Sequence, residues 1–350
     1  MRILTREALE RREHELLSPE ATHAASSLGR RRPEPPDPYR TCFQRDRDRI
    51  VHSKSFRRLA NKTQVFLAPE GDHYRTRLTH TLEVAQVSCA IARSLALNVD
   101  LTEAVALGHD LGHTPFGHAG ERALCAAMAS HKGIDPASAE ARRLFRHNEQ
   151  SVRVVDVLEK NGEGLNLSFE VTDGMRCHSH GARAMTPEGR IVSMADRIAY
   201  VCHDIDDAER AGLLDEAELP AGARAILGDT SSERIATMVH DVVSSSSRRG
   251  DVCMSDDVWG ALMSLRSYLY RNLYHQGDAK SEEPKAERVV SQLFAHFMAH
   301  LDEVPREYKL FDDPASVQVA DFLASMTDRY AIRVFEELSV PRAWGLRSNR

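Results

Sequence analysis

The stretch GHDLGHTPFGHAGE, residues 108–121, decides most of what the sequence predicts. It places three histidines, one aspartate and one glutamate within 13 residues, beside glycines that let the backbone turn tightly. His109 and Asp110 are adjacent near the expected end of a helix, which Pro115 cannot continue. His113 follows His109 by four residues, on the same helical face. Imidazole and carboxylate groups together suit divalent metal ions, so His109 and Asp110 are candidate ligands of one ion.

Histidine is concentrated around this stretch. Ten of the 17 histidines lie between His73 and His203, where an even spread would put about six. Two flanking segments add candidates for the same site. RTRLTHTLEV (75–84) sets His80 at the start of an amphipathic helix, beside arginines that suit phosphate. ADRIAYVCHDIDD (195–207) sets a polar stripe on an otherwise apolar helix. The stripe consists of Asp196, Tyr200, His203 and Asp204.

The composition is that of an ordinary globular protein. Hydrophobic residues make up 42% and charged residues 28% of 350, which excludes collagen-like, coiled-coil and wholly disordered chains. No run of 18 apolar residues occurs and the charged N-terminus has no apolar core, so we expect neither a membrane helix nor a secretory signal. Six cysteines without a CxxC pair predict reduced thiols and a cytoplasmic location. The net charge of −6 argues against a surface covered in phosphate-binding charge.

Helical periodicity runs through nearly all of the chain after residue 40, so the predicted fold class is all-α. Asp100 with Glu103 forms a capping-box pattern before a helix that ends near Gly112. Residues 63–67 are the one candidate strand. The other helices are expected at about 3–17, 45–60, 79–97, 120–131, 141–161, 188–212, 231–246, 256–274, 284–303 and 315–338. We divide the chain into a charged helix with a loop or disordered linker (1–38), a core (39–225) and a helical C-terminal region (226–350).

Several long segments together resemble one enzyme family, the bacterial deoxyguanosine triphosphate triphosphohydrolases of the HD-domain metal-dependent phosphohydrolases. The resemblance runs from about residue 39 to 338 and implies an all-α HD fold. It also implies hydrolysis of a deoxynucleoside triphosphate (dNTP) between the 5′-oxygen and the α-phosphorus, which releases deoxynucleoside and triphosphate. The similar segments are 39–66, 75–84, 108–121, HNEQS (147–151), 195–207 and DFLASMTDRYA (321–331).

The resemblance also assigns roles to residues. It implies a site for a divalent ion (Mg, Mn, Fe, Co, Ni or Zn), whose ligands would be His80, His109, Asp110 and Asp196. The implied catalytic acid/base pair is His118 with Glu121, in which the carboxylate would orient the ring, and His113 supports it. Substrate contacts are implied for seven residues. These are Arg77 and Arg197 at the phosphates, Tyr200 against the deoxyribose, Asp204 and Gln64 at the 3′-hydroxyl, and Asn148 and Glu149 lining the site.

Some signals and alternatives stay open at this point. Cys177-His178 with His180 resembles a metal cluster, but without a second cluster at zinc spacing we set it aside. The competing functions are an HD phosphohydrolase of a nucleoside monophosphate or cyclic nucleotide, and a regulatory protein that binds nucleotide or single-stranded nucleic acid through an idle site. Beyond the dNTP substrate, the family implies a homo-oligomer and a dNTP as allosteric activator. No membrane partner is expected.

Overall fold

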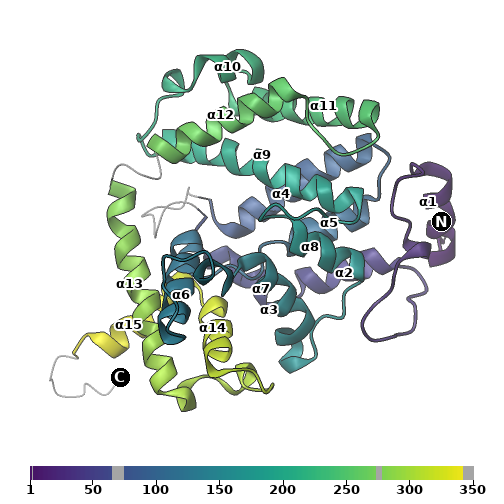
Figure 1. The fold of residues 1–350 in the computed structure, drawn as a ribbon. Helices are drawn as coiled ribbons and strands as arrows, with labels where there is room; N and C mark the ends of the chain where they lie inside the picture. The colour runs from purple at the N-terminus through teal and green to yellow at the C-terminus, as the bar shows by residue number, and fades with distance from the viewer. Residues whose placement is uncertain (2, 65–74, 273–277, 342–350) are drawn as a thin grey trace.

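The computed structural model describes residues 1, 3–64, 75–272 and 278–341. Within these ranges the chain forms fifteen α-helices and no sheet, which confirms the all-α class (Figure 1). The helices are α1 Arg6–Leu16, α2 Cys42–Val51, α3 Lys54–Arg58, α4 Arg77–Ser94, α5 Val99–Gly108, α6 Gly117–His131, α7 His147–Arg153, α8 Phe169–Cys177, α9 Pro187–Arg210, α10 Ala221–Leu227, α11 Ser231–Arg249, α12 Asp256–Asn272, α13 Asp278–Ala299, α14 Ala315–Ser325 and α15 Asp328–Ser339.

The apolar side chains form three clusters, and helices α4 and α9 belong to two of them. One cluster joins α4 and α9 to α10, α11 and α12, at the top of Figure 1. The second joins the other faces of α4 and α9 to α2, α5 and α8. The third joins α6 to α13, α14 and α15, at the lower left of Figure 1. Because α4 and α9 are packed on two sides, side chains on their remaining face are held rigidly.

Several local expectations are wrong. The helix expected after Asp100 begins at Val99, and its cap is Asn98, whose side chain accepts from the backbone N–H of Leu101. Asp100 instead accepts a hydrogen bond from Gln44, because its carboxylate faces helix α2. The helix expected over 141–161 is broken: α7 covers only seven residues of it, and a π-helical turn and a kink follow. The expected helix over 315–338 is likewise two helices, α14 and α15.

The segment 18–38 lies as a loop against the folded body. The Thr22 hydroxyl donates to Glu188 at 2.8 Å, the Ser27 hydroxyl donates to Glu170 at 3.0 Å, and Arg30 pairs with the buried carboxylate of Asp46. These contacts hold the loop to three separate helices. The divisions at residues 38 and 225 stay predictions. Of the expected strand 63–67, Thr63 makes an isolated bridge to Thr76, and residues 65–67 lie outside the described residues.

Candidate metal and phosphohydrolase site

Six helical segments bring their polar side chains to one place. His80 comes from the first turn of α4, and His109 and Asp110 follow directly after α5. Asp196 lies in the middle of α9. The remaining contributions come from the loop into α6, the start of α7 and the end of α8. The candidate site is therefore built from several helix ends and the middle of α9, which are far apart in the sequence.

The four predicted metal ligands converge. His80 Nε2 lies 3.1 Å from Oδ1 of Asp196. His109 Nε2 lies 3.5 Å from Oδ1 of Asp110 and 3.8 Å from Oδ1 of Asp196. The four residues fall in two groups that could each hold a divalent ion and that share His109, namely His80, His109 and Asp110, and His109, His178 and Asp196.

The buried ring of His109 tests whether this cluster fits a metal ion. Its Nδ1 lies 2.7 Å from the carbonyl oxygen of Ala106, so Nδ1 carries the proton and donates. Nε2 is then an acceptor, and it is buried without a hydrogen-bond partner among the described residues. An unpaired buried acceptor is costly, and a cation at Nε2 would remove that cost. The donor set fits a metal ion.

Arg77, predicted to contact a phosphate, is buried and bound to a candidate metal ligand. Its guanidinium is 2% exposed, and Nη1 donates to Oδ2 of Asp110 at 2.7 Å. Burial alone would raise the pKa of Asp110, but His109, His113 and Arg77 outweigh it and hold that pKa well below its usual value. Asp110 is therefore an ionised carboxylate over the whole physiological range. Contact of Arg77 with a phosphate stays a prediction.

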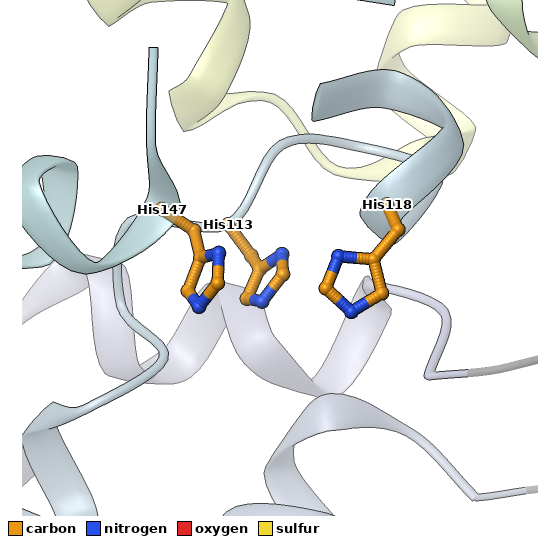
Figure 2. Close-up of side chains that lie close together, drawn as sticks. All are labelled: His113, His118 and His147. Carbon is orange, nitrogen blue, oxygen red and sulfur yellow. The ribbon is translucent and has the colours of Figure 1, made fainter. Parts of the chain in front are cut away.

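A second histidine cluster adjoins the first (Figure 2). The rings of His113 and His147 are stacked, with centroids 4.0 Å apart. The His118 ring meets His113 edge-on at 5.3 Å and is the exposed member, with 57% of its side chain accessible. Nitrogens of the three rings lie within 4.8 Å of one another. His118 thus faces the open side of the cluster, and the other two rings are buried.

Glu121 has a closer partner than the sequence suggested. Its Oε2 lies 2.9 Å from Nδ1 of His147 and 3.5 Å from Nδ1 of His118. Although burial disfavours a charged ring, the carboxylate of Glu121 raises the pKa of His147. Burial works against ionisation of Glu121 as well, but its histidine neighbours hold its pKa well below the usual value. The pair therefore favours an ionised carboxylate beside a buried imidazole whose charged form is stabilised, with His118 at its edge.

His178 belongs to the site although we set its motif aside. Its Nδ1 lies 2.7 Å from the carbonyl oxygen of Met175, and its Nε2 lies 3.3 Å from Nε2 of His147 and 3.9 Å from Oδ1 of Asp110. Burial lowers the pKa of His178 to about 3, so the ring is neutral. No spacing in the sequence links residue 178 to residue 110, because the contact joins the ends of two separate helices.

The remaining predicted substrate residues lie around the two clusters. Burial lowers the pKa of Arg197, whose guanidinium lies 6.0 Å from the centre of the Trp259 ring. Burial raises the pKa of Tyr200 well above its usual value, and the neighbouring carboxyl of Asp204 adds to the shift. Arg266 on α12, which the sequence did not single out, contributes its positive charge to both Arg197 and Tyr200.

Three further residues predicted to contact substrate, Asn148, Gln64 and Glu149, differ in their burial and hydrogen-bond partners. The Asn148 amide donates to the carbonyl of Arg176 at 2.6 Å, and its Oδ1 is buried without a partner among the described residues. Gln64 also has a buried Oε1 that lacks a partner within those ranges. Glu149 is exposed and pairs with Arg176 at 3.2 Å. Asn148 and Gln64 thus retain unused acceptors for a ligand, whereas the carboxylate of Glu149 is in solvent.

The C-terminal region braces the loop that carries the histidines. Phe116 has a left-handed backbone (φ 62°), and its N–H donates to Oδ1 of Asp328 at 3.0 Å. The buried ammonium of Lys62 donates to the carbonyls of His113 and Ala324, the latter at 2.7 Å. A side chain from α15 and a carbonyl at the end of α14 therefore fix the backbone between His113 and His118.

Gly112 allows this loop to pack against α7. A Cβ atom at Gly112 would lie 2.2 Å from the backbone nitrogen of Ser151, so no side chain fits. We expect Gly112→Ala to lower the free energy of unfolding by about 2 kcal/mol or more, because backbone must move. Urea unfolding measures this change. The matched control is Gly260→Ala on α12, where the space is open and stability should not fall. Equal stabilities for both variants would contradict the packing described.

Comparison with known proteins agrees with this geometry. The HD domain family matches residues 77–201, which contain all four candidate ligands, and a phosphohydrolase-associated domain matches residues 252–337. A deoxyguanosinetriphosphate triphosphohydrolase-like protein of Caldanaerobacter subterraneus subsp. tengcongensis is 51% identical over 97% of both chains. The chain belongs to the deoxyguanosinetriphosphate triphosphohydrolase-like family. Another protein of that description, from Desulfatibacillum aliphaticivorans, is 46% identical over 96% of this chain and 98% of its own.

Membership of the deoxyguanosinetriphosphate triphosphohydrolase-like family, with the HD domain, makes the chain an HD-type nucleotide phosphohydrolase. All six cysteines are described and none forms a disulfide. Among the described helices, none combines the length and the apolar character needed to cross a membrane.

Proposed function

We propose that this protein is a metal-dependent triphosphohydrolase that converts a dNTP, dGTP or another, to deoxynucleoside and inorganic triphosphate. The observation that carries the proposal is the convergence of His80, His109, Asp110 and Asp196, with the buried acceptor of His109 left open for a cation. The relatives named for dGTP hydrolysis support the choice of substrate.

The four converging side chains would hold the ion, and three features of the chain prepare them. Asp110 is ionised, His109 presents Nε2, and the site is largely closed to solvent. When bound, a divalent ion lowers the pKa of water and polarises a phosphoryl oxygen. Which ion the protein uses stays open, because two histidines and two carboxylates accept several.

His118 is the group we assign to protonation of the leaving 5′-oxygen. It is the exposed ring of the cluster, so a substrate can reach it without displacing protein. His113, by contrast, is buried, and burial holds its pKa well below the usual value, so it is neutral. Glu121 lies 3.5 Å from the His118 ring and keeps it oriented. His147, which shares this carboxylate, fixes the other side of Glu121.

The deoxyribose pocket is the proposed role of Tyr200, Asp204 and Gln64. A ring packed against the sugar leaves no room for a 2′-hydroxyl, which excludes ribonucleotides by contact alone. Arg197 and Arg266 would meet the outer phosphates, since guanidinium groups bind phosphate at two points. Arg77 and Asn148 would act from within the site, and Glu149 from its surface.

Burial favours the protonated, neutral form of the Asp204 carboxyl. The pKa of Asp204 lies well above its usual value because the carboxyl is buried, and the charge of Asp207 adds to the effect. A neutral carboxyl can donate to a sugar hydroxyl. We expect Asp204→Asn, also a neutral donor, to keep KM nearly unchanged and Asp204→Ala to raise it about tenfold, the cost of one hydrogen bond. Steady-state kinetics with the preferred dNTP measures both.

Asp204→Asn should also change how the stability of the folded protein depends on pH. In the unfolded chain an aspartate loses its proton near pH 4, but Asp204 in the folded protein loses it at higher pH. Folding therefore becomes less favourable as the pH rises from about 4 toward the folded-state pKa. Asp204→Asn should thus gain stability relative to wild type over that range, as thermal unfolding measures. A constant difference across pH would contradict a neutral Asp204.

Incubation of the metal-replete protein with each dNTP alone and with all four together tests the substrate. We expect deoxynucleoside and triphosphate from at least one condition. Product in the mixture but with no single dNTP would support the predicted activation by a nucleotide. Hydrolysis of nucleoside monophosphates or cyclic nucleotides with inert dNTPs would overturn the proposal, and binding without turnover would point to an idle site. The homo-oligomer, the single-stranded nucleic-acid partner and the cytoplasmic location stay predictions.

A further inference from the structure

His80 differs from the buried histidines His109 and His178 in how its outward nitrogen is held. His109 and His178 each direct Nδ1 at a backbone carbonyl, at 2.7 Å in both cases. His80 instead directs Nδ1 at another side chain, Nδ1 of His203, at 3.4 Å. Its Nε2 faces Asp196 and the cluster. The orientation of His80 therefore depends on His203.

His203 is itself held from the far side. Its Nε2 lies 2.9 Å from Oε2 of Glu83, and only 4% of its side chain is exposed. Glu83 in turn lies 3.3 Å from Nε of Arg75, so its carboxylate is fixed from two directions. A continuous row of polar groups thus runs from Arg75 at the outer end to the metal cluster.

The row follows from the spacing of residues on two packed helices. Helix α4 supplies His80 and, one turn later, Glu83, while α9 supplies Asp196 and, two turns later, His203. Residues three and seven apart lie on one helical face, so the four side chains alternate between the helices. The polar stripe predicted on α9 therefore supplies two members of this row, Asp196 at its inner end and His203 in its middle.

The direction of each proton follows from the chemistry. A ring that offers the Nε2 lone pair to an ion must carry its proton on Nδ1. The Nδ1–H of His80 then donates to Nδ1 of His203, which leaves the proton of His203 on Nε2, beside Glu83. Each group has one consistent role, and the negative charge of Glu83 makes both rings better donors of electron density.

We infer that His203 and Glu83 are positioning residues that hold His80 in the tautomer and orientation needed to bind a metal ion. The inference rests on the metal site of the proposed function. Carboxylates and carbonyls that orient a ligating histidine typically contribute 10–100-fold to metal affinity. A purely structural pair would leave metal affinity unchanged.

Titration of Mn²⁺ into the chelator-treated full chain, followed by calorimetry, tests the inference. His203→Leu removes the acceptor and should weaken Mn²⁺ binding by about 10–100-fold. His203→Asn places Oδ1 where Nδ1 stood and should recover most of that affinity. Glu83→Ala, at a partly exposed position, should weaken binding by about tenfold. The control is His240→Leu, an exposed histidine with the same replacement, which should bind as wild type does.

Wild-type affinity in both His203→Leu and Glu83→Ala, or equal losses in His203→Leu and His203→Asn, would overturn the inference and leave the proposed function standing. If wild type binds Mn²⁺ but hydrolyses no dNTP, the proposed substrate fails while the same titrations still decide the role of His203. If wild type binds no divalent ion, both proposals fall.

Discussion

Asp110→Ala is expected to lower kcat by about 10³-fold or more. Asp110 is a candidate ligand that also holds Arg77 at 2.7 Å, so its loss removes a metal ligand and leaves a buried guanidinium unpaired. Metal-ion activation contributes several kcal/mol to catalysis, and each 1.36 kcal/mol changes a rate about tenfold. The measurement is dNTP hydrolysis with excess Mn²⁺, with metal content determined on the same samples.

Asp302→Ala provides the matched control, because Asp302 is exposed and distant in sequence from every site segment. It should retain wild-type activity and metal content. Asp110→Asn should keep the fold better than Asp110→Ala, since an amide can still meet Arg77, yet it should lose activity as fully. Activity that survives in either Asp110 variant would show that the ion is not bound here.

His118→Ala is expected to lower kcat by about 10²–10⁴-fold, the usual contribution of a positioned acid. KM should change little, because protonation of the leaving oxygen occurs only in the transition state. The ring is 57% exposed, so its removal should change stability by no more than about 0.5 kcal/mol. Imidazole in the buffer should restore part of the rate, since the vacated position is open to solvent.

The competing assignment of the acid is His147, which binds Glu121 more closely. His147→Ala removes the nearer ionic partner of the buried carboxylate of Glu121 and should cost about 3 kcal/mol in unfolding free energy. His131→Ala, on the same helix as His118, should be silent in both measurements. If a folded His147→Ala variant is inactive while His118→Ala is active, the role of general acid belongs to His147 instead of His118.

The four candidate metal ligands, one half of the site, each carry a local signal in the sequence. His109 and Asp110 are neighbours, and the polar stripe that contains Asp196 is visible on one helix at helical spacing. His80 lies at the start of an amphipathic helix that the sequence predicts, beside arginines. Each of these signals depends on residues within two helical turns, and the structure brings all of them together.

The other half depends on contacts that no local pattern records. The pairing of Glu121 with His147 spans 26 positions, and the approach of His178 to Asp110 spans 68. Helix α10 was not expected, since seven residues carry too little periodicity to stand out. The cap at Asn98 was missed because Asp100 and Glu103 offered the same pattern two residues later. Tertiary packing chose between local alternatives in these cases.

Hydrolysis of the preferred dNTP by the metal-replete protein in H₂¹⁸O tests the central claim most directly. Water that attacks the α-phosphorus breaks the bond to the 5′-oxygen, so mass spectrometry should find one ¹⁸O in inorganic triphosphate and none in the deoxynucleoside. Orthophosphate or pyrophosphate as the product, or ¹⁸O in the deoxynucleoside, would contradict the account.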